Sequence, residues 1–315
     1  MNQAVAKQPN QLTPPLLTVQ GISVRFAGVM ALTDVSFQVQ PGELFAVIGP
    51  NGAGKTSLFN VLSRIYQPVA GSVTFDGRNL LRLRTYQTAR IGIARSFQNL
   101  GQFPNTIVLD YLLLGRHTRM RSGILLGGLY IGMTRSEERK NRAYCLHLLN
   151  LLGLERFRDT PLRSLPYGLQ KRTDLARALA LEPKLLLLDE PVAGMSLEET
   201  EDIASVILDV KEQLGVTQIL VEHDMALVMG IADRVLVLDF GRVIAQGTPA
   251  EVQANPDVIK AYLGEDFGGK ASLIPPGNEA GASSKAQAEY KEASILGQPG
   301  GNASNDALLP TDNSR

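Results

Sequence analysis

One eight-residue segment constrains the rest of the chain more than any other. It reads Gly49, Pro50, Asn51, Gly52, Ala53, Gly54, Lys55 and Thr56, and it follows the apolar run 45–48. Leucines at positions 58 and 62 then recur at helical spacing, so a helix is expected to begin at Gly54. A buried strand, a glycine-rich turn and a helix N-terminus form the context in which G-x-x-x-x-G-K-[ST] binds phosphate.

The chemistry of a phosphate site explains these residue types. Glycines let backbone N–H groups converge on phosphate oxygens, and the helix dipole adds positive potential at the same place. Lys55 supplies a positive charge for the β- and γ-phosphates of a nucleoside triphosphate, and the Thr56 hydroxyl can hold Mg²⁺. Ser57 is counted with them as nucleotide-binding. A chance glycine turn is the alternative, which the flanking strand and helix disfavour.

Composition excludes several classes of protein. Acidic and basic residues balance at 31 each in 315 residues, so no global field favours nucleic acid. Cys145 is the one cysteine, which rules out an internal disulfide and a cysteine-based metal site; we expect it to fill a core. No apolar run reaches the roughly 18 residues of a membrane span, and the polar start 1–15 lacks a signal peptide's apolar region. A cytosolic chain that meets a membrane only through a partner is expected.

The pattern along the chain predicts an α/β fold. Residues 1–14 are expected to be a disordered leader and residues 265–315 a disordered tail. Alternating apolar residues from 16 to 39 predict antiparallel strands ahead of the phosphate segment. Residues 84–182 are expected to be mostly helical, with segments near 107–118, 135–152 and 169–181. The apolar, glycine-rich stretch 123–133 would either dock another protein or fold into the chain's own core.

A second chemical signal ends a buried strand. The continuous apolar run 185–188 precedes Asp189 and Glu190, and alternating strands and helices after it indicate a parallel core sheet. Asp189 would lie beside the metal of the phosphate segment, whereas Glu190 would polarise a water in line with the γ-phosphate. Four apolar residues before Asp-Glu are weak evidence alone, because a solvated strand end has the same pattern. Together with the phosphate segment they become a strong signal.

The order of the segments resembles a known family. Residues 165–172 (L-P-Y-G-L-Q-K-R) precede an expected helix, which alone is more often an ordinary helix start than an anion site. The chain has, in order, the phosphate segment, Gln98 after a short strand, this turn, L-L-L-L-D-E and a strand ending in His223. That order resembles the ATP-binding domain of ABC-type ATPases over about residues 16–264. The resemblance implies a RecA-like parallel-sheet core, an antiparallel β-subdomain and a helical subdomain at about 84–182.

The resemblance also implies roles for single residues. Phe26 would stack on adenine, Gln98 would contact Mg²⁺ and water, and His223 would touch the γ-phosphate. A core-facing strand residue is the alternative for Phe26. Leu165 and Gly168 match the family's signature motif, usually L-S-G-G-Q, which completes the ATP site of a second ATPase subunit.

Two departures from the family pattern concern the interface between subunits. Pro166 and Tyr167 replace the serine and a glycine of the signature motif, and proline offers neither a hydroxyl nor an N–H. This weakens the expectation of hydrolysis at the site that the turn completes. The loop that matches the family's dimer contact ends in Ser196, where an aspartate is usual.

A narrower resemblance is to the branched-chain amino acid importer ATPases. The runs that carry this resemblance are G-I-A-R-S-F-Q (92–98), E-H-D-M (222–225), G-T-P (247–249), N-P-D-V-I (255–259) and A-Y-L-G-E (261–265). It implies ATP and Mg²⁺ as cofactors, a second ATPase subunit in a homodimer or heterodimer, two membrane-spanning permease subunits and, indirectly, a solute-binding protein. The location implied is peripheral, at the cytoplasmic face of the membrane, with no nucleic acid. A lipopolysaccharide-export ATPase and, more remotely, a soluble ABC ATPase acting on nucleic acid or ribosomes are the alternatives.

Overall fold

The computed structural model describes residues 14–96, 103, 105–116 and 132–263, and side chains are described in all of these except 132–135. Gln98, the stretch 123–131, the tail and all but the last residue of the expected leader lie outside the described residues. The strands are β1 (Leu17–Phe26), β2 (Val29–Val39), β3 (Leu44–Ile48), β4 (Ala70–Phe75), β5 (Arg78–Asn79), β6 (Ile93–Arg95), β7 (Leu185–Asp189), β8 (Thr217–Val221), β9 (Arg234–Asp239) and β10 (Arg242–Gly247). The α-helices are α1 (Lys55–Leu62), α2 (Thr85–Ile91), α3 (Val108–Arg116), α5 (Gly132–Leu151), α6 (Tyr167–Leu179), α7 (Leu197–Leu214), α8 (Met225–Ile231), α9 (Pro249–Gln253) and α10 (Pro256–Leu263).

An antiparallel sheet of β2-β1-β4-β5 opens the fold, as the alternating pattern predicts. Its strand β1 carries a bulge, because the register to β2 shifts between Val19 and Ile22. Gly21 lies in this bulge with a φ of 61°, a left-handed conformation that glycine adopts without steric penalty. The extra residue changes the phase of the alternation, so that Val19 and Ile22 are both buried.

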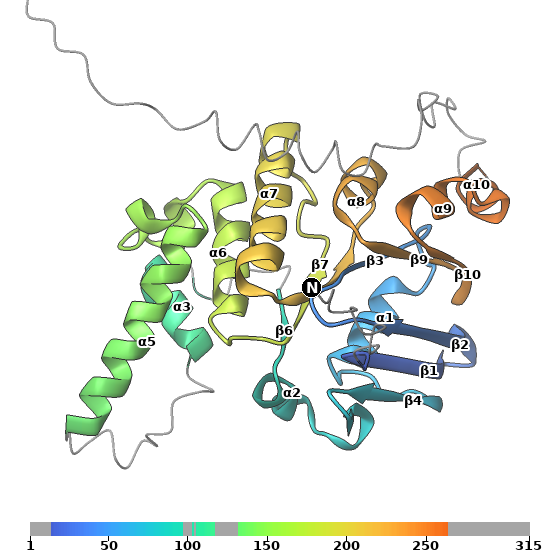
Figure 1. Ribbon diagram of the computed structural model, residues 1–315, viewed down its shortest axis with the longest axis horizontal. Helices are drawn as coiled ribbons and strands as arrows, with labels where there is room; N and C mark the ends of the chain where they lie inside the picture. Colours follow the sequence, from blue (N-terminus) through green and yellow to red (C-terminus); the bar gives the residue numbers. More distant parts are fainter. Residues whose placement is uncertain (1–13, 97–102, 104, 117–131, 264–315) are drawn as a thin grey trace, which may run out of the picture. The chain divides into compact units, whose positions relative to one another are not determined.

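The second sheet has the order β10-β9-β3-β8-β7-β6. Strands β9, β3, β8, β7 and β6 run parallel, and β10 adds an antiparallel edge. Every residue of β3, β7 and β8 is buried, which is typical of strands covered on both faces. Figure 1 shows why: helices α7 and α8 lie on one side of this sheet, and β1, β2 and β4 lie on the other. The predicted α/β class with a parallel core is confirmed.

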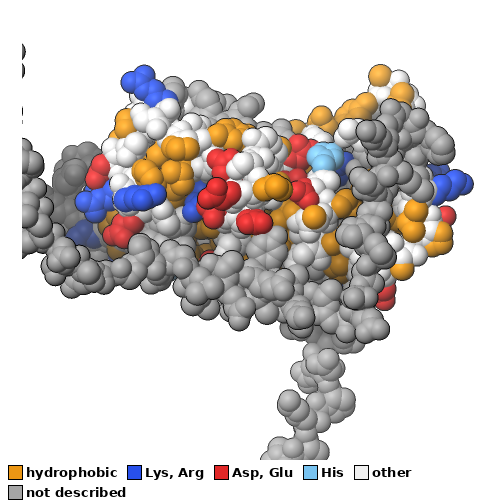
Figure 2. Space-filling model, turned by 90° about the horizontal axis from the view of Figure 1, so that it is seen from above, with side chains coloured by type: hydrophobic (Ala, Val, Ile, Leu, Met, Phe, Trp, Pro, Cys, Tyr) orange, Lys and Arg blue, Asp and Glu red, His pale blue; other side chains and the backbone are white. Residues whose placement is uncertain are grey.

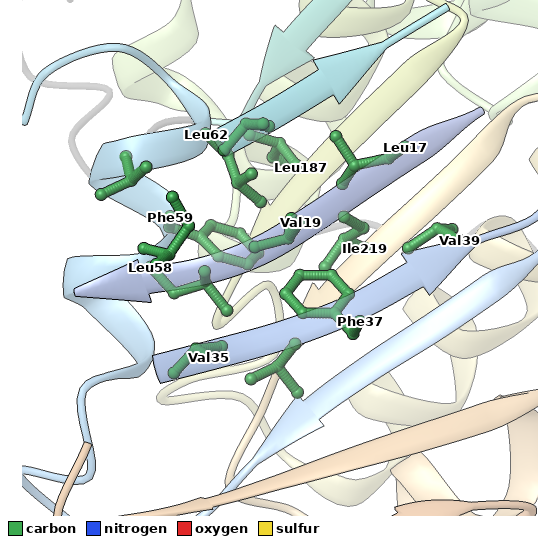
Figure 3. Close-up of a cluster of buried hydrophobic side chains, with 14 of the residues drawn as sticks. Leu17, Val19, Val35, Phe37, Val39, Leu58, Phe59, Leu62, Leu187 and Ile219 are labelled. Carbon is green, nitrogen blue, oxygen red and sulfur yellow. The ribbon is translucent and has the colours of Figure 1, made fainter. Parts of the chain in front are cut away.

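The main core lies between the two sheets. Alternate residues of the parallel strands, among them Phe45, Leu187 and Ile219, face side chains of the antiparallel sheet. Leu58 and Phe59 of α1 fill the space between the two layers, as Figure 3 shows. Fully burying a side chain of this size contributes about 1.5–3 kcal/mol. The helix that follows the phosphate segment is therefore held on its inner face by the core.

The block 84–182 is mostly helical where it is described, but it also contains β6. Gly92 ends α2 in a left-handed conformation, and Ile93 then enters the parallel sheet beside Leu185 of β7. Arg116 of α3 donates hydrogen bonds to Asn141 of α5 and to the carbonyl of Ala180, just after α6. These contacts hold α3, α5 and α6 together. None of the helices within the described ranges has the length and apolar character that a membrane crossing requires.

Candidate functional site

The phosphate loop joins β3 to α1 and requires glycine at its first position. Gly49 has a φ of 147°, and a Cβ there would lie 2.0 Å from the carbonyl oxygen of Leu238 in the adjacent strand β9. No side chain fits in that space. Gly54 has a φ of 103° and is the N-cap residue of α1, so the helix begins at the predicted position. The N-terminal N–H groups of α1 therefore face the loop, which is the arrangement that binds phosphate.

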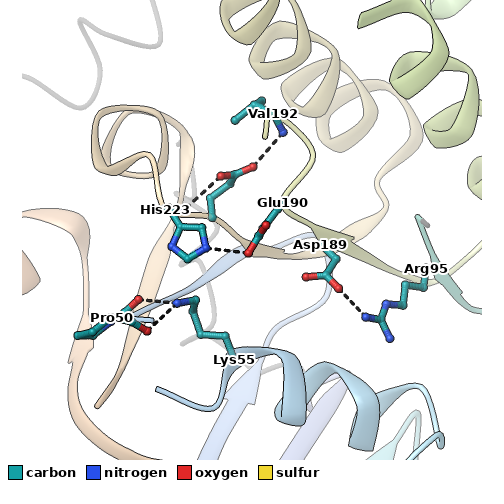
Figure 4. Close-up of polar contacts among 9 residues, drawn as sticks. Pro50, Lys55, Arg95, Asp189, Glu190, Val192 and His223 are labelled. Atoms are coloured by element: carbon teal, nitrogen blue, oxygen red, sulfur yellow. Dashed lines mark hydrogen bonds and ion pairs between the residues drawn. The ribbon is translucent and has the colours of Figure 1, made fainter. Parts of the chain in front are cut away.

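Lys55 is only 6% exposed and bends back over this loop. Its ammonium donates hydrogen bonds to the carbonyl oxygens of Gly49 at 2.5 Å and Pro50 at 2.9 Å (Figure 4). Beside it is a hollow of about 210 Å³. The residues that line the hollow are Ala31, Asn51, Gly52, Ala53, Gly54, Lys55, Thr56, Ser57, Glu190 and His223.

Glu190 and His223, which lie far apart in the sequence, meet at this hollow. Glu190 follows β7, and its φ of 49° is unusual for a residue with a side chain. Its backbone N–H donates to the carbonyl oxygen of Val221 at the end of β8. Nε2 of His223 lies 2.7 Å from Oε1 of Glu190 (Figure 4). With a proton on Nε2, the imidazole donates in this bond and the carboxylate oxygen accepts.

Glu222 supports both of these residues, although it was not among the residues predicted from the sequence. Its side chain is 3% exposed, and burial raises the pKa of its carboxyl above the ordinary value. One oxygen accepts a hydrogen bond from the N–H of Val192 at 2.9 Å, and the other accepts from the N–H of His223 at 3.0 Å. Glu222 thereby ties the loop after Glu190 to the end of β8. The sequence feature that could have revealed Glu222 is its position directly before His223, which was already expected in the site.

Asp189 lies on the other side of the strand end and pairs with Arg95. Its Oδ2 is 2.5 Å from the guanidinium of Arg95, and the aspartate side chain is 3% exposed (Figure 4). Arg95 also donates to Oδ1 of Asn60 and lies over the ring of Phe59, both in α1. Arg95 was not among the residues predicted from the sequence either. A basic residue ending the apolar strand β6 could have revealed it.

The residues near the loop fit the requirements of Mg²⁺. Magnesium prefers oxygen ligands and binds through one or two protein oxygens, with waters and phosphate oxygens completing its shell. Thr56 offers a hydroxyl that lines the hollow, whereas the carboxylate of Asp189, one residue before Glu190, lies outside the lining and pairs with Arg95. Within the described ranges, no group of three or more His, Cys, Asp and Glu side chains could hold a metal by itself. The donor set thus suits a metal that arrives with a nucleotide.

Some of the described residues predicted for the site do not line the hollow, namely Phe26, Gly49, Pro50, Leu165, Gly168 and Asp189. Phe26, at the end of β1, is 41% exposed. Its ring packs edge to face with the ring of Tyr66, and the two ring centroids lie 4.7 Å apart. The alternative reading of Phe26 as a core-facing residue therefore fails. Leu165 and Gly168 stand at the start of α6 instead. Gln98 lies outside the described residues, three positions after the end of β6.

The predicted signature turn is already part of α6. This helix begins at Tyr167, two residues before the expected start at 169, with Pro166 as its N-cap residue. Proline suits this position because a helix start leaves its N–H groups unpaired. The hydroxyl of Tyr167 donates to the carbonyl oxygen of Ala193, so the turn contacts the loop that follows Glu190.

Comparison with known proteins decides the family. A family model described as "ABC transporter" matches residues 32–193, just over half of the chain. The chain belongs to the ABC transporter ATP-binding family. A second model, "Branched-chain amino acid ATP-binding cassette transporter", matches residues 242–268. The expected family is confirmed, and the chain is an ABC-type ATP hydrolase.

Several curated relatives of this cassette are similar over their whole length. The high-affinity branched-chain amino acid transport ATP-binding protein BraF of Pseudomonas aeruginosa is 39% identical over 254 residues, covering 81% of this chain and 100% of BraF. LivG of Escherichia coli, with the same descriptive name, is 37% identical with the same coverage.

Solved ABC cassettes share the fold. The ADP conformation of MJ1267, an ATP-binding cassette of an ABC transporter, aligns with a TM-score of 0.70 and 28% identity, covering 80% of this chain and 100% of that one. The dimeric structure of MJ0796, a bacterial ABC transporter cassette, aligns with a TM-score of 0.62 and 25% identity, covering 74% of this chain and 98% of that one.

Proposed function

We propose that this chain is the ATP-hydrolysing subunit that powers an importer of branched-chain or other amino acids. Two findings support the substrate class. The relatives BraF and LivG are named as branched-chain amino acid transport proteins, and the model for that transporter type matches residues 242–268. The observation that carries the activity is the meeting of Glu190 and His223 at the phosphate loop.

Each residue proposed for the site would have a role that follows from its chemistry. The loop N–H groups and Lys55 bind the β- and γ-phosphates of ATP. Glu190 accepts a proton from the attacking water, and His223, 2.7 Å away, orients that carboxylate. Thr56 and Asp189, together with Gln98, would hold Mg²⁺, which neutralises charge between the β- and γ-phosphates when bound. Phe26 would stack on the adenine, with Tyr66 supporting its ring.

The proposed assembly contains a second ATPase subunit. The dimeric MJ0796 cassette is consistent with such a pair. Leu165 and Gly168 would complete the ATP site of that second subunit, while its own signature motif completes the site at Lys55. Two membrane-spanning permease subunits and, indirectly, a solute-binding protein would complete the importer at the cytoplasmic face of the membrane.

A pair of two different ATPase subunits is the form that fits Pro166 best. The partner's unaltered signature would then serve the phosphate loop of this chain, and Pro166 would weaken only the other site. A dimer of this chain alone should therefore hydrolyse ATP more slowly than the mixed pair. Equal rates of ATP hydrolysis for the two assemblies would contradict the proposed asymmetry between the two ATP sites.

Transport by intact cells tests the proposed function. Cells that lack this subunit should lose uptake of labelled leucine, and the wild-type gene should restore it whereas Glu190→Gln should not. Labelled neutral amino acids and urea, measured in parallel, identify the solute class. Unchanged uptake of every one of these solutes would overturn the proposal. Co-purification in detergent adds a check, since permease subunits should accompany the chain.

Nucleic acid is not expected in that preparation. The face of the molecule in Figure 2 carries acidic and basic side chains intermixed with hydrophobic ones wherever the structure describes it. A nucleic-acid surface requires clustered basic residues. Copurifying nucleic acid would favour the soluble ABC ATPases that act on it.

A further inference from the structure

Two helices of this chain begin with the same capping arrangement. At the start of α7, Oε2 of Glu199 accepts hydrogen bonds from the N–H of Ser196 at 3.0 Å and from its hydroxyl at 3.2 Å. At the start of α9, Oε2 of Glu251 accepts the corresponding bonds from Thr248 at 2.7 and 3.0 Å. Both are capping boxes, in which a glutamate returns to the residue that caps its own helix.

Glu199 differs from Glu251 because it also reaches a second helix. Its carboxylate lies against Gly168 in the first turn of α6, and the pKa of Glu199 is lowered mainly by the N–H of Ser196 and further by the N–H of Gly168. Oε1 is the oxygen that lies against Gly168, since a Cβ on that glycine would be 2.8 Å from it. One carboxylate therefore joins the N-termini of α6 and α7.

Electrostatics explains why a carboxylate is needed between these helices. Each helix N-terminus carries about half a positive charge, so two adjacent N-termini repel each other. A carboxylate with one oxygen toward each of them offsets both charges and forms charge-assisted hydrogen bonds. A glutamine has a single carbonyl oxygen and could serve only one of the two helices.

Further contacts join α6 to α7 and to the loop that precedes α7. The hydroxyl of Tyr167 donates to the carbonyl oxygen of Ala193, and Arg172 of α6 pairs with Asp202 of α7 at 2.9 Å. The loop from Ala193 to Ser196 begins three residues after Glu190. A displacement of the start of α6 would therefore be transmitted directly to the loop that follows Glu190.

We propose that Glu199 is a positioning residue that couples the first turn of α6 to the loop 190–196, so that both move as one unit during ATP turnover. The inference rests on the proposed function, since it assumes turnover at Glu190. Glu199 does not line the hollow, so it acts through these two segments rather than on the nucleotide. The altered signature residue Tyr167 belongs to the same coupling.

The substitution Glu199→Gln tests the coupling, with Glu251→Gln as the matched control. Gln still forms a capping box, so α7 and α9 should both survive. In the full-length chain assembled with its partner subunits, Glu199→Gln should lower kcat for ATP about 5-fold or more, because displaced catalytic groups reduce rates steeply. KM and ATP binding should stay within about twofold, since the phosphate loop is untouched. Glu251→Gln should keep the wild-type kcat.

Amide hydrogen exchange supplies a readout independent of rate. In Glu199→Gln, the amides of 167–169 and those of 193–196 should exchange faster together, whereas Glu251→Gln should leave both segments unchanged. Equal kcat values for the two variants, or faster exchange in only one segment, would overturn the coupling. Failure of the proposed function is distinguishable, because it would appear as missing solute uptake with the wild-type chain.

Discussion

Nε2 of His223 lies 2.7 Å from Oε1 of Glu190, although 33 residues separate them in the sequence. They meet because β7 and β8 are adjacent parallel strands whose ends lie side by side. The bond holds the carboxylate over the phosphate loop, where both side chains line the same hollow. A general base must be positioned before its basicity matters, and this bond provides the position.

The first prediction concerns that base. Glu190→Gln should lower ATP turnover by about 10² or more, because a general base contributes about that factor. ATP should still bind, since Lys55 and the loop N–H groups are unchanged. Phosphate release measures the loss of turnover, and a fluorescent ATP analogue measures the retained binding. Turnover within about twofold of wild type would remove Glu190 from the role of base.

A second prediction concerns the buried pair of Arg95 and Asp189. Arg95→Met should lower the free energy of unfolding by about 3–5 kcal/mol, because it leaves the Asp189 carboxylate buried without its partner. Urea unfolding of the full chain measures the loss. The double variant with Asp189→Asn should recover part of it, since no buried charge then remains.

The exposed pair of Lys184 and Asp76 supplies the control. Both side chains are about half exposed, at 56% and 45%, although their atoms lie only 2.6 Å apart. Lys184→Met should therefore change the free energy of unfolding by about 0–1 kcal/mol. An equally small effect of Arg95→Met would show that solvent screens the Asp189 pair as well.

The third prediction is a pH dependence of stability from Glu222. Burial raises its pKa above the ordinary 4.5, so the folded protein keeps this proton where the unfolded chain has lost it. The stability that protonation adds is present below pH 4.5 and is lost as pH rises through the folded pKa. In urea unfolding, the advantage of wild type over Glu222→Gln should shrink as pH rises across that range.

An exposed glutamate on α7 calibrates this measurement. Glu201→Gln removes a carboxyl from a position that is exposed to solvent. If the difference for Glu222→Gln varied with pH no more than the difference for Glu201→Gln, burial would not govern the titration of Glu222.

The fourth prediction concerns Cys145. The thiol is fully buried, and burial raises its pKa to about 11. Because the thiolate is the reactive form, alkylation by iodoacetamide at pH 8 should be about two orders of magnitude slower in the native protein than in urea. Mass spectrometry reads this directly, since the chain has one cysteine. Comparable native and denatured rates would contradict its assignment as a core residue.

Local signals explain how much could be predicted. The phosphate loop is contiguous, so its strand, turn and helix start were all visible, and α1 begins at the expected residue. Asp189 was visible because it ends the buried strand β7 with a carboxylate, and His223 because it lies two residues beyond the end of the buried strand β8. Their roles and those of Phe26 and Gln98 stay predictions.

The missed residues depend on tertiary contacts. Arg95 and Glu222 matter because each forms a hydrogen bond with a residue more than 25 positions away, and no local pattern encodes those partners. The contact of Glu199 with Gly168 was hidden for the same reason, since the capping box of Glu199 is locally complete. Helix α6 begins two residues earlier than predicted, because Pro166 caps this helix instead of belonging to a turn ahead of it.

The place of β3 in the sheet has a consequence for biosynthesis. Its neighbours are β8 and β9, and the bond from the N–H of Leu44 to Asp233 joins residues 189 positions apart. The ribosome therefore makes this apolar strand early and its partners late, so both of its edges stay open during most of translation. Such a strand invites aggregation. A prematurely terminated product would carry the complete phosphate loop sequence and yet lack the sheet that gives the loop its shape, which makes it a substrate for chaperones and proteases.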